Sequence, residues 1–427
     1  MNNNLLLSLT ESILSRDFCV ATYYVSLPPG SDPYEKAKNM AVGQTIGTWI
    51  PVPGITEEMR QNYMGKIVNI YDLQPDDLES PIPAGSGLEH YIFQIAYPVA
   101  NFENSIPLLL TTLLGNDAST SVQAKLIDLY LPKRMLSSFP GPAYGIEGIR
   151  SLCQVEKRPI LLNMIKPCTG FSPEVGARIF YSTALGGIDL IKDDELLGNP
   201  SYCPLTERIR AYNQASKAAF EETGKETIYI PNITDHVSRL VDHAKAAQEA
   251  GAKIVMVNFA ATGFGALQML REETDLPIMG HYAGAGPYYE GPTSGVTSSL
   301  VLGKLPRLLG ADIVMINTPY GGYPIKRSRY LRTAQELTLA LPGIRPALPS
   351  CGGGVNPGMA ETLIRDLGND IILAPGGAIQ GHPMGSQAGV RAMFAAVEAA
   401  MNGTSLEETA RQCPELEAIR HLWKKEA

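Results

Sequence analysis

Apolar runs followed by segments with helical spacing recur along the C-terminal two-thirds of the chain. The runs are continuously apolar, as expected of strands buried on both faces of a parallel sheet. Eight such units over roughly 240 residues have the size of a (β/α)8 TIM barrel, and an open doubly wound sheet is the alternative. The predicted strands are Ile160–Ile165, Ile188–Ile191, Thr227–Ile233, Lys253–Phe259, Pro277–Gly280, Asp312–Ile316, Arg345–Leu348 and Asp370–Leu373.

The N-terminal part has a mixed pattern that predicts a small ferredoxin-like α+β domain. Pro and Gly are concentrated at Phe139–Tyr144, which marks a domain boundary. We therefore expect an α+β domain at 1–145, an α/β barrel at 146–404 and a C-terminal helical extension at 405–427. The predicted N-terminal strands are Phe18–Leu27, Lys66–Leu73, His90–Tyr97 and Lys125–Leu131, and the predicted helices are Asp32–Ala41 and Ser105–Leu114.

The composition is that of an ordinary soluble globular protein, with 44% apolar and 18% charged residues. A net charge of −8 gives no reason to expect nucleic acid or an anionic membrane as a partner. The six cysteines are scattered without a CxxC pair, which argues against a zinc site or disulfides and favours the cytoplasm. The densest apolar stretch, Ile106–Leu114, is too short to span a bilayer, and the N-terminus lacks the basic residues of a signal peptide.

The stretch Gly186–Glu195 (GGIDLIKDDE) ends a predicted buried strand with four ionisable residues. Because alternate side chains of an extended chain share a face, Lys192 and Asp194 should point together while Asp193 points away. Glu195 can swing back towards the same point. A lysine converging with two carboxylates suggests a site for a hard cation, and a solvated charged turn is the alternative.

Catalytic groups of such barrels lie just past the C-terminal ends of the strands. In this chain those positions are polar or glycine at nearly every strand, which favours an active site over a charged turn. They are Lys166, Lys192, Asp194, Glu195, Asn232, Asn258, His281, Asn317, Ser350–Gly354, Gly376 and Gly377.

Together these motifs resemble the RuBisCO large-chain superfamily over nearly the whole chain. GGIDLIKDDE resembles the family's metal site, which implies a CO2-derived carbamate on Lys192 that binds Mg²⁺ with Asp194 and Glu195. Met164–Pro167 (MIKP) resembles the strand of the catalytic lysine, here Lys166. Gly47–Trp49 and Pro375–Gly385 resemble the phosphate-binding segments.

Several departures separate the chain from the true carboxylases. Tyr282 stands in place of an arginine and Met315 in place of a histidine, and the loop Thr318–Arg327 has glycines in place of an essential lysine. Gly43 replaces a catalytic glutamate, and Cys168 replaces a lysine. Because a bisphosphate cannot be bound at both ends without those groups, the chain resembles the RuBisCO-like proteins, and we expect no fixation of carbon dioxide.

Within that group the chain is most similar to the methionine-salvage enolases, which act on a diketo-methylthiopentyl phosphate. One departure from the enolases is Asn116, which stands in place of their general-base lysine. Cys351 stands where the carboxylases have a serine. The alternatives are an isomerase or a decarboxylase of a β-keto sugar-acid phosphate using the same enediolate, or a catalytically silent regulatory protein. The shared segments are Ile46–Trp49, Ile95–Thr112, Val301–Leu305, Pro319–Gly321 and Asn356–Met359.

The resemblance implies a role for each candidate residue. Either Lys166 or the Lys192 carbamate is the base. A nearby cation would lower the pKa of Lys166 and suit it to proton transfer. The alternative is that Lys166 only forms a salt bridge to Asp194 or Glu195. The strand-end position of His281 favours contact with substrate, with a packed histidine as the alternative, whereas His382 lies in a glycine- and proline-rich turn and is expected to be structural. Backbone amides at the glycines bind the phosphate, and the partner subunit of a homodimer with shared active sites completes the site. These phosphate-site residues are Gly352, Gly353, Gly376 and Gly377, with Thr48, Trp49 and Asn116 from the partner.

Overall fold

The computed structural model describes residues 13, 17–47, 52–73, 87–120 and 123–422. The chain divides into two compact units, of which the first comprises Met1–Phe139 and Ala285–Val301. The second comprises Pro140–Gly284 and Leu302–Ala427. The segment Ala285–Val301, from the middle of the predicted barrel sequence, thus belongs to the N-terminal unit. The predicted domain boundaries had assigned this segment to the barrel.

The N-terminal unit is built on a five-stranded sheet in the order β10-β4-β1-β3-β2. β1 pairs antiparallel with β3 and β4, and β2 pairs antiparallel with β3. The chain order β1-α2-β2-β3-α4-β4 with this pairing is the predicted ferredoxin-like fold. The elements are β1 (Phe18–Leu27), α2 (Pro33–Gly43), α3 (Glu57–Tyr63), β2 (Lys66–Asp72), β3 (Glu89–Pro98), η2 (Val99–Asn101), α4 (Ile106–Leu114), α5 (Asn116–Ser119), β4 (Gln123–Tyr130), α6 (Lys133–Leu136), α13 (Gly286–Tyr289) and β10 (Gly295–Val296).

Two helices of this unit begin one residue later than predicted, because the first predicted residue is the N-cap. The carboxylate of Asp32 accepts hydrogen bonds from the backbone N–H groups of Tyr34 and Glu35, ahead of α2. The hydroxyl of Ser105 accepts one from the N–H of Leu108, ahead of α4. β10 was not predicted, because two residues are too few to show a period.

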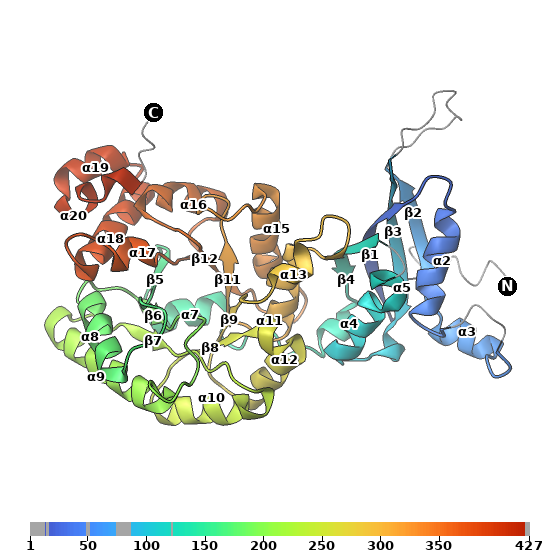
Figure 1. Cartoon of the computed structure of the whole chain (residues 1–427), viewed down its shortest axis with the longest axis horizontal. Coiled ribbons are helices and arrows are strands. Elements are labelled where there is room, and N and C mark those ends of the chain that lie inside the picture. Colours follow the sequence, from blue (N-terminus) through green and yellow to red (C-terminus); the bar gives the residue numbers. More distant parts are fainter. Residues whose placement is uncertain (1–12, 14–16, 48–51, 74–86, 121–122, 423–427) are drawn as a thin grey trace. The chain divides into compact units, whose positions relative to one another are not determined.

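The second unit is an eight-stranded parallel barrel (Figure 1). The strand order β7-β6-β5-β13-β12-β11-β9-β8 places two consecutive strands at the ends of the sheet, and a parallel bridge between Asn232 and Met256 joins them. The sheet is therefore closed, and the open doubly wound alternative is wrong. The strands are β5 (Ile160–Met164), β6 (Leu190–Lys192), β7 (Ile228–Ile230), β8 (Val255–Asn258), β9 (Ile278–His281), β11 (Ile313–Asn317), β12 (Leu348–Gly352) and β13 (Ile372–Leu373).

Helices follow the strands in alternation and surround the sheet (Figure 1). None of the helices in the described parts of the chain combines the length and apolar composition needed to cross a membrane. The helices are α7 (Gly145–Cys153), α8 (Pro173–Ala184), α9 (Leu205–Thr223), η3 (Val237–Arg239), α10 (Leu240–Glu249), α11 (Phe259–Thr262), α12 (Phe264–Glu273), η4 (Leu300–Lys304), α14 (Leu305–Leu308), α15 (Arg327–Thr338), η5 (Pro357–Met359), α16 (Ala360–Leu367), α17 (Gly377–Gln380), α18 (Ser386–Asn402), α19 (Leu406–Gln412), α20 (Pro414–Glu417) and η6 (Arg420–Leu422).

The barrel interior is a packed apolar core, to which nearly every strand contributes. Ile160, Leu190 and Met256 are examples, and each is fully buried. Their neighbours along the strands are buried as well, which explains the continuous apolar runs in the sequence. One strand prediction was displaced: β12 begins at Leu348, where the predicted seventh strand ends, because Pro, Ser and Gly in this strand read as a turn.

Candidate active site

The predicted site residues of the barrel meet at the C-terminal ends of neighbouring strands. Lys192 is the last residue of β6, and it lies opposite Met164 at the end of β5, two residues before Lys166. Asp194 and Glu195 follow β6 directly, and His281 is the last residue of β9. The barrel thus brings together groups from three strands, at the edge where such barrels hold their catalytic residues.

Lys192 is fully buried among oxygen atoms. Its Nζ donates a hydrogen bond to the backbone oxygen of Asp193 at 2.9 Å and lies 3.7 Å from Oε2 of Glu195. Burial lowers the pKa of Lys192, and the charges of Glu195 and Asp194 offset only part of this effect. Burial therefore shifts the protonation equilibrium of Lys192 towards the neutral amine, the form that can add carbon dioxide.

Asp193 points away from Lys192, as the alternation predicts. Its carboxylate is fully buried and accepts hydrogen bonds from Arg208 at 3.0 and 3.2 Å, from the Tyr229 hydroxyl at 2.6 Å and from the N–H of Asn232 at 2.8 Å. Arg208 is also fully buried. Arg208 thus anchors Asp193 to α9, and Tyr229 anchors it to β7.

Lys166 and Asp194 form an ion pair with Nζ and Oδ2 2.6 Å apart. Lys166 Nζ also lies 3.1 Å from Sγ of Cys168. Burial lowers the pKa of Lys166, but hydrogen bonds to Asp194 and Cys168 outweigh it and raise the pKa above its usual value. The salt-bridge alternative is thus what the structure contains, and the expected lowering of the pKa would require a cation that draws Asp194 away.

His281 is buried beside Glu195, with Nε2 3.5 Å from Oε2. Its Nδ1 accepts a hydrogen bond from the N–H of Ala283 at 3.2 Å, which assigns the proton of the neutral ring to Nε2. Burial lowers the pKa of His281 far below its usual value, and the charges of Lys192 and Lys166 add to this. The ring is therefore a neutral hydrogen-bond donor near neutral pH.

Two asparagines support the residues after β6, a role that sequence reasoning missed. The side-chain amide of Asn258 donates to the backbone oxygen of Glu195 at 2.9 Å, and that of Asn232 donates to the same oxygen at 3.1 Å. Their positions at strand ends were visible in the sequence, but their partners were not. The Oδ1 atom of Asn258 is buried without a hydrogen-bond partner, so this polar atom is free for a ligand.

The unmodified side chains of the described residues do not by themselves form a metal site. Across the described residues, no group of three or more His, Cys, Asp and Glu side chains is placed to hold a metal ion. Asp194 and Glu195 provide two carboxylates, and a carbamate on Lys192 would provide the third anionic oxygen that Mg²⁺ prefers. The residues therefore fit a hard divalent cation on the condition that Lys192 is carbamylated.

The candidate phosphate-binding glycines lie at two neighbouring strand ends. Gly353 and Gly354 follow β12 with φ of +79° and +80°, and Gly377 opens α17. A Cβ at Gly377 would have no atom within 4 Å, whereas one at Gly376 would lie 2.7 Å from Sδ of Met164. A cavity of about 220 Å³ adjoins these turns, lined by Gly354, Val355, Asn356, Gly377, Ala378, Gly381, Pro383, Ile419, His421 and Leu422.

The remaining predicted residues belong to the N-terminal unit, have structural surroundings in the barrel or lie outside the described chain. Thr48 and Trp49 lie outside the described residues, and Asn116 begins α5 in the N-terminal unit. His382 bonds the backbone oxygen of Glu415 at 2.8 Å, which fits its predicted structural role. Burial raises the pKa of the Cys351 thiol to about 12, which leaves it unreactive.

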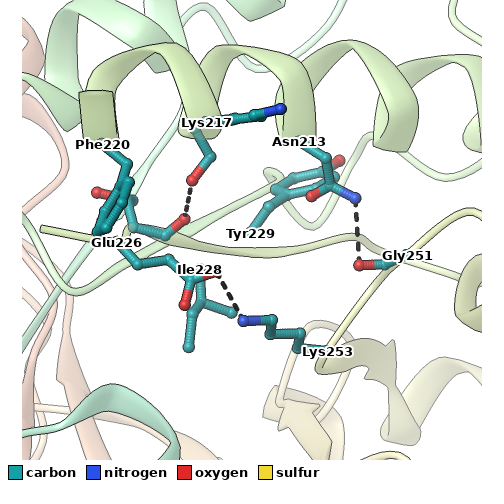
Figure 2. A pocket seen from close by; sticks show the side chains of 10 residues that line it. Asn213, Lys217, Phe220, Glu226, Ile228, Tyr229, Gly251 and Lys253 are labelled. Atoms are coloured by element: carbon teal, nitrogen blue, oxygen red, sulfur yellow. Dashed lines mark hydrogen bonds and ion pairs between the residues drawn. The ribbon is translucent and has the colours of Figure 1, made fainter. Parts of the chain in front are cut away.

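A second cavity, of about 360 Å³, lies at the N-terminal ends of β7 and β8, and Figure 2 shows the side chains that line it. It lies between α9 and the residues that precede β7 and β8, and several of its polar groups are bonded to one another. Lys253 pairs with Glu226 at 2.6 Å, and the Asn213 amide donates to the backbone oxygen of Gly251 at 3.1 Å. This cavity is separate from the carboxylate and lysine cluster.

Comparisons with known proteins find similar chains over nearly the whole length. An archaeal ribulose bisphosphate carboxylase-like protein from Archaeoglobus fulgidus is 41% identical over 95% of this chain and 93% of its own. A 2,3-diketo-5-methylthiopentyl-1-phosphate enolase from Geobacillus kaustophilus is 37% identical over 95% of this chain and 97% of its own. The crystal structure of a rubisco-like protein (MtnW) from Alicyclobacillus acidocaldarius superposes with a TM-score of 0.87 at 34% identity, over 96% of this chain and 100% of the other.

Both units of the chain match one family. Residues 12–135 match the N-terminal domain of the ribulose bisphosphate carboxylase large chain, and residues 145–423 match its catalytic domain. The chain therefore belongs to the ribulose bisphosphate carboxylase large-chain family, and its named relatives include enolases and carboxylase-like proteins.

Proposed function

We propose that the chain is a cytoplasmic, Mg²⁺-dependent enolase of 2,3-diketo-5-methylthiopentyl-1-phosphate, as several of its relatives are named. The observation that carries this proposal is the buried Lys192 beside Glu195, with Lys166 and Asp194 paired at the next strand end. This arrangement suits the removal of a proton next to a carbonyl group. A silent protein would have no need of a buried lysine among carboxylates.

Lys192 as its carbamate, Asp194 and Glu195 would hold the Mg²⁺ ion. When bound, the ion supplies positive charge that stabilises the negative oxygen of an enolised substrate. With the ion held by Asp194, this carboxylate would no longer pair with Lys166. Lys166 is thereby left with one strong hydrogen bond fewer, which lowers its pKa and suits it to carry the proton. His281 donates a hydrogen bond from Nε2 to the substrate.

The phosphate group would be bound by backbone amides at the glycine turns. Gly377 leaves open space above its Cα, and Gly353 takes a positive φ that favours glycine. Thr48, Trp49 and Asn116 would complete this end of the site from the second subunit of a homodimer, as the family resemblance implies. These local groups would then bind the phosphate even though the whole chain carries a net negative charge.

We propose that the protein does not fix carbon dioxide onto substrate. A Cβ at Gly43 would lie 1.9 Å from Oδ2 of Asp117, so the glutamate of the carboxylases would require the Asp117 side chain to move. Met315 is buried beneath Gly352, and Tyr282 donates a hydrogen bond to Asn317. Neutral side chains thus stand where a second phosphate would need cations.

Asn116 favours a second candidate function, which uses the same enediolate intermediate. Because it replaces the lysine that the enolases use as a base, the same enediolate could serve an isomerase or a decarboxylase of a β-keto sugar-acid phosphate. The test is hydrogen–deuterium exchange, followed by NMR, across a panel of phosphorylated ketones with and without Mg²⁺ and bicarbonate. We expect exchange only with both present; no exchange with any ketone would support the silent protein, and rearranged or decarboxylated products would support the second candidate.

A further inference from the structure

The cavity beside the glycine turns is lined in part by the C-terminal extension. Gly354 and Gly377, from the two turns proposed to bind the phosphate, line this cavity of about 220 Å³. Ile419, His421 and Leu422 line it as well. The volume is far larger than the roughly 10–15 Å³ that one water molecule needs, so it leaves room for a phosphate group. The extension therefore reaches the place where the phosphate is proposed to bind.

His421 carries the uncommitted polar side chain of this cavity. Of the described residues that line it, only Asn356 and His421 have polar side chains, and none is acidic. The Asn356 amide is used within its own turn, because its Oδ1 accepts from the N–H of Gly358 at 3.0 Å and its Nδ2 donates to the backbone oxygen of Gly354 at 3.4 Å. The His421 ring is exposed and has no hydrogen-bond or ion-pair partner among the described residues. An imidazole ring offers at least one N–H in either protonation state, which suits it to an anion.

His382 bonds the C-terminal extension to the turn that precedes α18. Its Nδ1 accepts a hydrogen bond from the N–H of Met384 at 3.1 Å, so Nε2 carries the proton. Nε2 then donates to the backbone oxygen of Glu415, in α20, at 2.8 Å. The neighbours of His382 along the chain, Gly381 and Pro383, both line the cavity. One side chain thus joins the extension to a wall of the cavity.

Further contacts fix the backbone that carries His421. Arg420, the residue before it, pairs with Glu417 at 3.1 Å and also with Glu407 of α19. Ile419 is 2% exposed, so it anchors the start of η6 in the core of the extension. α19 and α20 pack in turn against α18 (Figure 1). His421 is therefore exposed to solvent on a backbone that is held on both sides.

We propose that His421 is a side-chain ligand of the substrate phosphate, and that His382 positions it by holding the C-terminal extension at the glycine turns. This inference rests on the proposed function, because it adds a ligand to the same phosphate site. His421 touches the phosphate through a ring N–H. His382 acts only through the backbone of Glu415, so it is a positioning residue.

The first test measures enolisation of 2,3-diketo-5-methylthiopentyl-1-phosphate by the full chain, with Mg²⁺ and bicarbonate. We expect His421→Ala to raise KM about tenfold without changing kcat, as the loss of one hydrogen bond to a charged group predicts. His421→Gln keeps an N–H donor and should raise KM less. Arg411→Ala is the matched control, since Arg411 is an exposed cation of the same extension that does not line the cavity. It should change neither kinetic constant.

The second test asks whether His382 acts through His421. His382→Ala should raise KM in the same direction, and His382→Gln should restore it, because the glutamine amide can donate where Nε2 does. In a chain that already carries His421→Ala, His382→Ala should raise KM little further, because the group that it positions is gone. An equal rise in KM with and without His421 would show that His382 has no positioning role.

Inorganic phosphate separates this inference from the proposed function. Its binding to the full chain without Mg²⁺, followed by phosphorus NMR, needs no turnover, and His421→Ala should weaken it about tenfold. If the unaltered protein enolises no ketone but phosphate binding depends on His421, the proposed function is wrong and the assignment of His421 stands. If neither KM nor phosphate binding depends on His421, the assignment of His421 is wrong.

Discussion

Replacement of Arg208 by Met tests how the fold holds the strand that carries Lys192. Arg208 donates two hydrogen bonds to Asp193, one to the Tyr229 hydroxyl and one each to the backbone oxygens of Cys203 and Gly198. Both members of the Arg208–Asp193 pair have side chains that are 0% exposed. The variant therefore leaves a buried carboxylate with two hydrogen bonds and without its positive partner.

The expected cost follows from that uncompensated charge. Breaking a buried ion pair by removing one partner lowers the free energy of unfolding by about 3–5 kcal/mol. Asp193→Asn should also destabilise the fold, because it leaves Arg208 charged and buried. The double variant Asp193→Asn with Arg208→Met should lose less than the sum of the single losses, by about 1–3 kcal/mol, because neither charge remains.

Urea unfolding followed by circular dichroism measures these differences, and its pH dependence provides a second check. Burial raises the pKa of the Asp193 carboxyl, and Arg208 counteracts this. Without Arg208 the pKa in the folded state rises further above the unfolded value. The folded variant then binds a proton more tightly than the unfolded chain, so its loss of stability is smallest at acidic pH and grows as pH rises through that pKa. Strict additivity of the single losses, or a loss independent of pH, would refute the reasoning.

Three further predictions concern the site itself. Lys192→Ala should abolish both Mg²⁺ binding in bicarbonate, measured by calorimetry, and deuterium exchange; an active variant would contradict the carbamate. Lys166→Met should slow exchange by about a hundredfold or more while Mg²⁺ still binds, and exchange at the original rate would exclude its role in proton transfer. Gly377→Ala should raise KM without changing the thermal unfolding midpoint, since its Cβ meets no atom within 4 Å. Gly376→Ala, which would crowd Met164, should lower that midpoint instead, and the reverse pattern would contradict the assignment of the two glycines.

The sequence by itself determined the architecture and pointed to the candidate residues of the site. Barrel strands buried on both faces must be apolar throughout, so their pattern is visible without a structure. Polar residues at the strand ends then stand out, which is why Lys166, Lys192 and His281 could be named from the sequence. The alternation along β6 also placed Asp193 away from Lys192, because alternate side chains of an extended chain lie on opposite faces.

Tertiary structure alone decided what those groups contact. The bridge between Asn232 and Met256 closes the barrel, and the pairing of Lys166 with Asp194 joins residues 28 positions apart. The partners of Asp193 lie on two further elements, so no local pattern reveals them. The same holds for Asp366 on α16, which pairs with Arg327, the first residue of α15, 39 positions earlier in the chain. Local sequence reports burial and periodicity, whereas charges that meet across strands depend on the closed packing of the whole barrel.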